Sequence, residues 1–143
     1  MKTALIAALS IATAATALPM AAMAHADDTG YAFQSPSGNI VCKGDASFAI
    51  CQIHDRTYVA PLVSQCEAGG SDPNTFQLDQ GKPAHFACDY NSIYYGPPLQ
   101  PLGYGQTQSD SPITCDSQLS GVTCTDASTG HFFRVSRDSY QLG

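Results

Sequence analysis

The spacing of six cysteines constrains this chain more than any other feature of its sequence. They are Cys42, Cys51, Cys66, Cys88, Cys115 and Cys124. An even number of cysteines in a small chain is typical of a disulfide framework in an oxidising compartment, and six allow fifteen pairings. The spacing favours one of them, Cys42 with Cys51 and Cys115 with Cys124, which leaves Cys66 for Cys88. A zinc site is the alternative, but the chain has no C-x-x-C pair.

The residues around the two short cysteine pairs alternate in polarity as in β-hairpins. With Cys42 opposite Cys51 in an antiparallel pair, Ile40 lies opposite Ile53, and residues 44–47 form the turn. One face of this hairpin then carries Ile40, Cys42, Ala49, Cys51 and Ile53. The second copy has an inner face of Ile113, Cys115, Val122 and Cys124. Its outer face carries Thr114, Asp116, Thr123 and Thr125.

The remaining segments also favour strands. The pattern predicts a third hairpin, formed by Phe76–Leu78 and Ala84–Cys88. It also predicts a closing hairpin, formed by Gly130–Ser136 and Tyr140–Leu142. Residues 89–105, rich in Tyr, Pro and Gly, predict a long surface loop that ends in a short strand near Leu102–Tyr104. Residues 62–66 are compatible with a short helical turn, and no other segment indicates a helix. We therefore predict a mainly β fold, a small antiparallel sheet or a sandwich or barrel of hairpins, stapled by three disulfides.

The first 26 residues have the features of a secretory signal peptide. Lys2 supplies the positive charge, Ala4–Leu18 the apolar run, and A-x-A sites allow cleavage after Ala24 or Ala26. The apolar run is shorter than the roughly 20 residues that cross a bilayer, so we expect no membrane insertion after the signal is removed. The prediction is a secreted or periplasmic protein with a single domain at residues 27–143.

The charge of the chain limits the partners it can have. Residues 27–143 contain five Lys and Arg against twelve Asp and Glu, and the five cations are scattered. Such a surface repels phosphate backbones and anionic lipids, so nucleic acid is not an expected partner. The acidic charge does not by itself indicate a basic partner, because a need for solubility explains it equally well.

Several motifs resemble a known family. Residues 33–42, FQSPSGNIVC, are similar to the opening of a family of small exported bacterial proteins, mostly actinobacterial, whose cysteine-containing domain is uncharacterised. Gly121-Val-Thr-Cys124, the Gly130-x-x-Phe-x-x-Ser-Arg-x-x-Tyr140 ending and Leu102-Gly-Tyr-Gly105 match other parts of the family pattern. The chain departs from it at Tyr58, near where the family often has Trp, and at Phe132, where it has Gly. The resemblance implies an exported domain and carries no activity.

The sequence has no motif for catalysis. No serine lies in a G-x-S-x-G elbow, and the only local His-Asp cluster is His54-Asp55, whose side chains point to opposite faces of a strand. A small hydrolase built from His54, His85 or His131 with a distant carboxylate is the alternative function. The single glutamate, Glu67, is expected to face solvent. No cofactor is expected, although cleavage after Ala24 would make His25 a terminal copper ligand.

The leading hypothesis is a non-enzymatic domain that binds a protein or a cell-envelope component. Its candidate binding residues are Tyr90, Tyr94, Tyr95 and Tyr104, on a loop stiffened by prolines. The alternative is that these rings pack over a sheet edge and protect it. Arg137 is expected to pair with a nearby carboxylate.

Overall fold

A computed structural model describes residues 30–61, 73–88 and 91–143, and within these ranges the chain forms ten β-strands and no helix. The strands are β1 (Tyr31–Gln34), β2 (Ile40–Gly44), β3 (Phe48–Ile53), β4 (Thr75–Asp79), β5 (His85–Ala87), β6 (Thr107–Asp110), β7 (Ile113–Gln118), β8 (Gly121–Asp126), β9 (Phe132–Val135) and β10 (Tyr140–Leu142). The mainly β prediction is confirmed. The expected helical turn at 62–66 lies outside the described residues.

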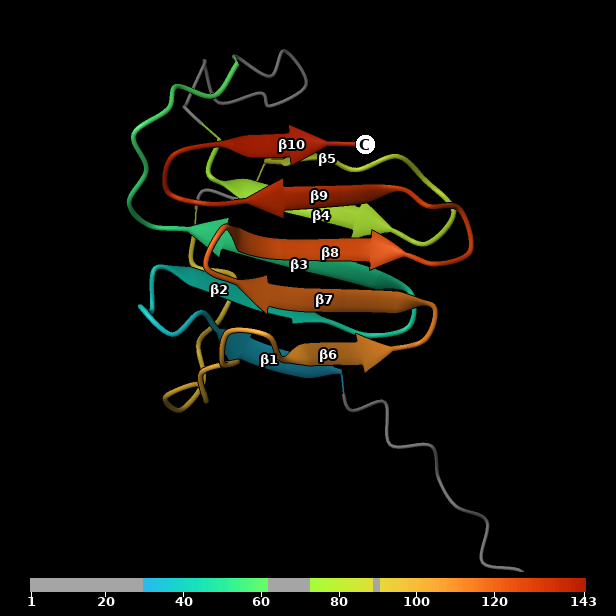
Figure 1. Ribbon diagram of the computed structural model, residues 1–143, viewed down its shortest axis with the longest axis horizontal. Coiled ribbons are helices and arrows are strands. Elements are labelled where there is room, and N and C mark those ends of the chain that lie inside the picture. Colours follow the sequence, from blue (N-terminus) through green and yellow to red (C-terminus); the bar gives the residue numbers. More distant parts are fainter. Residues whose placement is uncertain (1–29, 62–72, 89–90) are drawn as a thin grey trace, which may run out of the picture.

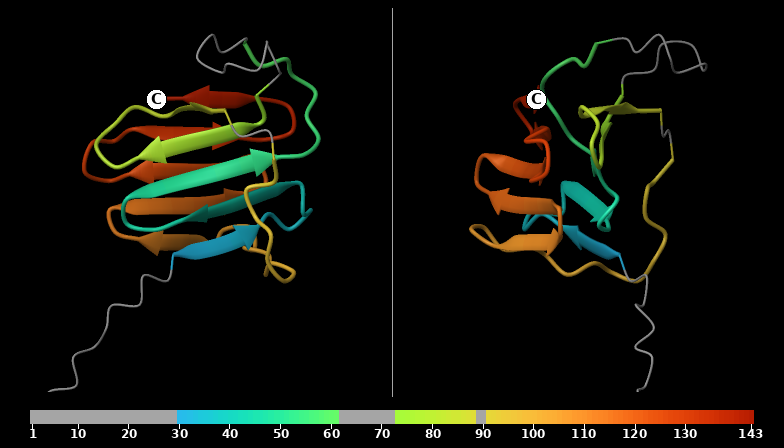
Figure 2. Two further views of the ribbon diagram at one scale, coloured as in Figure 1. Left: turned by 180° about the vertical axis from the view of Figure 1, so that it is seen from behind. Right: turned by 90° about the vertical axis from the view of Figure 1, so that its right-hand side faces the viewer.

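The strands form two antiparallel sheets that pack face to face as a sandwich (Figures 1 and 2). Each sheet is a meander in which every strand pairs with its sequence neighbour, β1 to β5 in one and β6 to β10 in the other. The inner faces meet where β4 contacts β8 and β9, and where β3 contacts β7. Of the architectures that the sequence left open, the sandwich is therefore the one that forms.

The two short disulfides lie at the centre of this sandwich. Cys42 pairs with Cys51 across β2 and β3, Cys115 pairs with Cys124 across β7 and β8, and all four are fully buried. Both predicted registers are confirmed, including Ile40 opposite Ile53. The two bridges also touch, because the Sγ atoms of Cys51 and Cys124 are 3.8 Å apart. A sulfur contact thus joins the middle of one sheet to the middle of the other.

The third predicted pair falls only partly within the described structure. Cys88 is disulfide-bonded, while Cys66 lies outside the described residues. The predicted hairpin that leads to Cys88 is confirmed, because β4 pairs with β5 with Phe76 opposite Phe86. These two rings form an aromatic cluster with Tyr140 and Phe133, with ring centroids 4.9 to 5.9 Å apart. Tyr58 joins this cluster, with its ring centroid 5.1 Å from that of Tyr140.

The turns of the two sheets gather at two opposite ends of the sandwich (Figure 1). We call one the serine end, where the β1–β2, β7–β8 and β9–β10 turns lie (residues 35–39, 119–120 and 136–139). The other is the aspartate end, where β2, β4, β6 and β8 finish and where Asp45, Asp79, Asp110 and Asp126 lie. Strand β1 begins and β10 stops at the aspartate end, so both ends of the folded region lie away from the serine end.

Two strands differ from the sequence prediction. No strand forms at Leu102–Tyr104; instead Pro101 makes a single bridge to Gln34, and the next strand, β6, begins at Thr107. Strand β6 is polar and largely solvent-facing, so it carries no apolar alternation that a sequence pattern could reveal. Strand β1 was also missed, because the segment Tyr31–Gln34 is too short to show a period.

Candidate functional site

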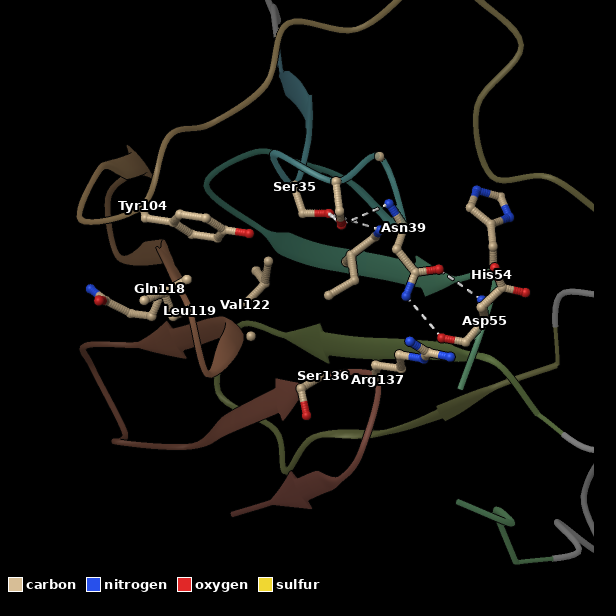
Figure 3. Close-up of a pocket in the computed structure, with 14 residues that line it drawn as sticks. Ser35, Asn39, His54, Asp55, Tyr104, Gln118, Leu119, Val122, Ser136 and Arg137 are labelled. Atoms are coloured by element: carbon tan, nitrogen blue, oxygen red, sulfur yellow. Dashed lines mark hydrogen bonds between the residues drawn. The ribbon is translucent and has the colours of Figure 1, made fainter. Parts of the chain in front are cut away.

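The serine end is hollowed. A depression of about 590 Å³ lies there, bounded by the β1–β2 turn, the end of β3, Tyr104, the β7–β8 turn and the β9–β10 turn (Figure 3). This volume lies within the range of small-molecule sites, roughly 300 to 1,000 Å³. The sandwich brings together residues from both sheets that are about a hundred positions apart in sequence. We take this hollow as the candidate binding site.

One wall of the hollow is built by the turn Ser35–Asn39. The Ser35 hydroxyl accepts a hydrogen bond from the Ile40 N–H at 3.0 Å, and Gly38 takes the left-handed conformation (φ 73°) that closes the turn. The Asn39 side chain then joins this turn to β3: its amide donates to the Asp55 carbonyl, and its oxygen accepts from the Asp55 N–H, both at 2.8 Å. These bonds hold the His54-Asp55 segment against the turn.

The opposite wall comes from the other sheet. Thr57 ties it to the first by donating its N–H to the Arg137 carbonyl at 2.8 Å and its hydroxyl to the Asp138 carboxylate at 3.2 Å. We expected Arg137 to pair with a nearby carboxylate, and this expectation is wrong for the part of the chain that is described. Asp138 is engaged by Thr57 instead, and the Arg137 guanidinium borders the hollow with no ion pair there.

Two large apolar side chains border the hollow and remain exposed. Leu119, at the tip of the β7–β8 turn, is 86% exposed, and Tyr104 is 51% exposed. Figure 3 shows them on one side of the hollow, with His54, Asp55 and Arg137 on the other. The site therefore has an apolar side and a charged side. Sequence reasoning singled out Tyr104 but missed Leu119, whose only signal was its place in a turn, Gln118 to Gly121.

The predicted tyrosine loop is a strap across the outer face of the β1–β5 sheet (Figure 2, right). We use the name strap for residues 91–102. Ile93 is buried against Ile50 and Ala87 on that face, and the Gln52 amide donates to the Asn91 carbonyl at 2.9 Å and accepts from the Ile93 N–H at 3.4 Å. The strap then reaches β1, where the Leu102 N–H donates to the Gln34 carbonyl at 2.8 Å.

The four candidate tyrosines are not equivalent. Tyr95 is 82% exposed, whereas Tyr94 is half-buried and donates its hydroxyl to the Pro97 carbonyl at 3.0 Å. Tyr104 borders the hollow, and Tyr90 lies outside the described residues. The edge of β1 is covered by strap backbone at Pro101 rather than by tyrosine rings.

The histidines are dispersed. His54 lies at the serine end, His85 is exposed on β5, and His131 precedes β9 at the aspartate end. In the described ranges no histidine side chain hydrogen-bonds to a serine hydroxyl or a carboxylate. Among the described residues, none of the three histidines therefore has the hydrogen-bonded partner that the hydrolase alternative expects. His25 and Glu67 lie outside the described residues.

The two large pKa shifts are structural rather than part of the hollow. Hydrogen bonds from the Gly81 N–H at 2.7 Å and from the Ser128 hydroxyl lower the pKa of the buried Asp126 to about 2. Asp126 thereby joins the β8–β9 turn to the β4–β5 turn of the other sheet. Burial, helped by Asp110 and Asp45, raises the pKa of Tyr31 to about 12, and its hydroxyl donates to Cys115 Sγ at 3.4 Å.

No family model, curated protein or solved structure matches the chain. The resemblance to the exported bacterial family thus stays a prediction. The described residues contain no group of three or more side chains that could hold a metal ion. They also contain no helix long and apolar enough to span a membrane. The class defined by fold and site is a disulfide-stapled β-sandwich with a hollowed turn end.

Proposed function

We propose that this protein is a non-enzymatic binding domain of the secreted or periplasmic space, and that its contact surface is the serine end. The observation that carries the proposal is Leu119, an apolar side chain 86% exposed at the border of a hollow. Ligand sites are typically preformed hollows with an apolar lining, and Leu119 supplies such lining together with Tyr104. The buried disulfides are compatible with an oxidising compartment, and the signal-like first 26 residues support export.

The partner we propose is a protein or another component of the cell envelope. Loops carried on a rigid sandwich are suited to such contacts because the scaffold limits the entropy lost on binding. Tyr95 on the strap does not border the hollow, but it offers a second exposed contact, with a rigid ring that costs little entropy to immobilise. Tyr94 is assigned to the strap itself, since its hydroxyl is engaged by Pro97.

The test is site-specific photo-crosslinking on cells that produce the protein. A photoreactive phenylalanine analogue replaces Leu119 in one variant and the exposed Lys82, at the aspartate end, in the control. We expect a discrete adduct from position 119 and none from position 82. Equal labelling from both positions, or none from position 119, contradicts the proposal.

A second measurement separates binding from packing on the strap. Because Tyr95 is exposed, Tyr95→Ala should leave the melting temperature within about 1 °C of the parent, a shift equivalent to less than roughly 0.5 kcal/mol. Ile93→Ala is the contrasting variant. It removes the buried anchor of the strap and should cost about 2 to 4 kcal/mol. A large loss of stability in Tyr95→Ala would show that the ring packs on the fold.

A further inference from the structure

The two sides of the hollow differ in chemistry, and this difference limits what can bind. The Tyr104 and Leu119 side lacks charge, whereas the opposite side carries Arg137 and His54 (Figure 3). An arginine with no carboxylate partner keeps its fork of N–H donors available for an acceptor on a ligand. Within the described structure Arg137 forms no ion pair, and the carboxylate of Asp138, the next residue, accepts a hydrogen bond from Thr57.

One carboxylate does share the hollow with Arg137. Asp55 borders it, and its backbone is fixed by Asn39, so its side chain cannot move far away. Both groups are exposed, which makes their mutual effect small, of the order of 1 kcal/mol or less. Asp55 therefore weakens the attraction of an anion but does not cancel the bidentate donors of Arg137.

The distribution of charge along the sandwich favours the same end for anions. Among the described residues, the aspartate end combines four aspartates with Lys43, Lys82 and His131. The turns of the serine end combine two aspartates with two arginines and a histidine, namely Asp55, Asp138, Arg56, Arg137 and His54. Counted over these described residues, the aspartate end has the more negative balance, so an approaching anion is repelled less by the charges of the serine end.

We propose that the hollow binds an organic carboxylate that carries an apolar side chain. Arg137 donates to the carboxylate oxygens, and Tyr104 and Leu119 cover the apolar group. The inference rests on the proposed function and names the ligand chemistry of its contact surface. The carboxylate belongs either to a small free acid or to the C-terminus of a peptide, and the two sources share this recognition chemistry.

The experiment is an NMR titration of the intact ¹⁵N-labelled protein with matched probes. The first is N-acetyl-L-phenylalanine, and the second is its amide, which has the same shape but no charge. We expect shifts confined to amides around the hollow, with roughly millimolar affinity for the acid and about tenfold weaker binding of the amide. N-acetyl-Ala-Ala-Phe identifies the source: tighter binding than the first probe indicates a peptide C-terminus, and equal binding indicates a free acid.

Charge variants test the assignment of Arg137. Arg137→Gln should weaken binding of the acid about tenfold and leave binding of the amide unchanged. Arg134→Gln removes the same charge from the neighbouring strand, outside the hollow, and should have no effect. Asp55→Asn should act in the opposite direction and tighten binding of the acid about threefold.

Apolar variants test the other side. Leu119→Ser should weaken the acid and the amide alike, whereas Val59→Ser, an equally exposed residue at 87% that does not border the hollow, should weaken neither. The proposal is overturned if the acid and the amide bind with equal affinity, or if Arg137→Gln and Arg134→Gln have equal effects. It is also overturned if no probe binds. A crosslink from position 119 combined with any of these results leaves the binding domain standing and removes only the carboxylate.

Discussion

The contact between the two central disulfides allows a quantitative prediction about stability. In the variant Cys42→Ala/Cys51→Ala, a loop with a sequence separation of nine opens. On the chain-entropy model the loss is about 2.7 kcal/mol. Both sulfurs are fully buried, and the space they leave adds a packing cost, so we expect a total of roughly 3 to 5 kcal/mol. Cys115→Ala/Cys124→Ala opens a loop of the same separation and should cost the same.

A quadruple variant that lacks all four sulfurs tests how much the sulfur contact between the sheets contributes to stability. The 3.8 Å approach of the Cys51 and Cys124 sulfurs is lost in either double variant, so it is counted twice when the two losses are added. The quadruple variant should therefore lose about 0.5 to 1 kcal/mol less than the sum.

The measurement is guanidinium unfolding followed by circular dichroism. The dependence of the unfolding free energy on denaturant should become steeper in each variant, because an uncrosslinked chain exposes more surface. A loss below about 1 kcal/mol in either double variant would refute the entropic reasoning. Strict additivity in the quadruple variant would show that the sulfur contact contributes nothing.

Three further predictions concern Asp126, Tyr31 and Gly121. Asp126 has its pKa lowered from 3.8 to about 2, so its contribution to stability is complete above pH 4 and is lost as the pH falls towards 2; in Asp126→Asn, urea unfolding should show a shallower acid dependence. Tyr31 has its pKa raised to about 12, so one tyrosine should ionise late in an ultraviolet titration, and Tyr31→Phe should remove that step. Gly121 has φ 120°, and an added Cβ would lie 2.2 Å from the Val135 carbonyl oxygen. Gly121→Ala should therefore lower the unfolding free energy by at least about 2 kcal/mol. The control Gly130→Ala, where an added Cβ meets open space, should lower it by about 1 kcal/mol.

The hairpins could be predicted from the sequence because two constraints agree in them. Around Cys115 and Cys124, the alternation of apolar and polar residues fixes which face is buried, and the disulfide fixes which residues lie opposite each other. Neither constraint acts between hairpins. The sequence therefore left the choice among sheet, sandwich and barrel open, because that choice depends on contacts such as Cys51 with Cys124, 73 positions apart.

The candidate site could be predicted only in part, for a related reason. Tyr104 was identified because aromatic residues in a Gly- and Pro-rich loop are conspicuous. Leu119 was missed because one apolar residue in a turn carries no pattern, and it gains meaning only when Ser35–Asn39 and Arg137 are placed beside it. Arg137 was assigned to an ion pair because the sequence places Asp138 beside it, whereas the fold supplies Thr57 as the partner of that carboxylate.

The position of β10 in the sandwich has a practical consequence for handling the domain. Since β10 finishes at the aspartate end, a linker attached after Gly143 leaves from the side opposite the hollow. A biosensor chip, a fluorescent fusion or a display scaffold can therefore hold the protein by Gly143 with the serine end directed outward. Immobilisation through Lys82 gives the same orientation, whereas coupling through side chains of the serine end would block the hollow.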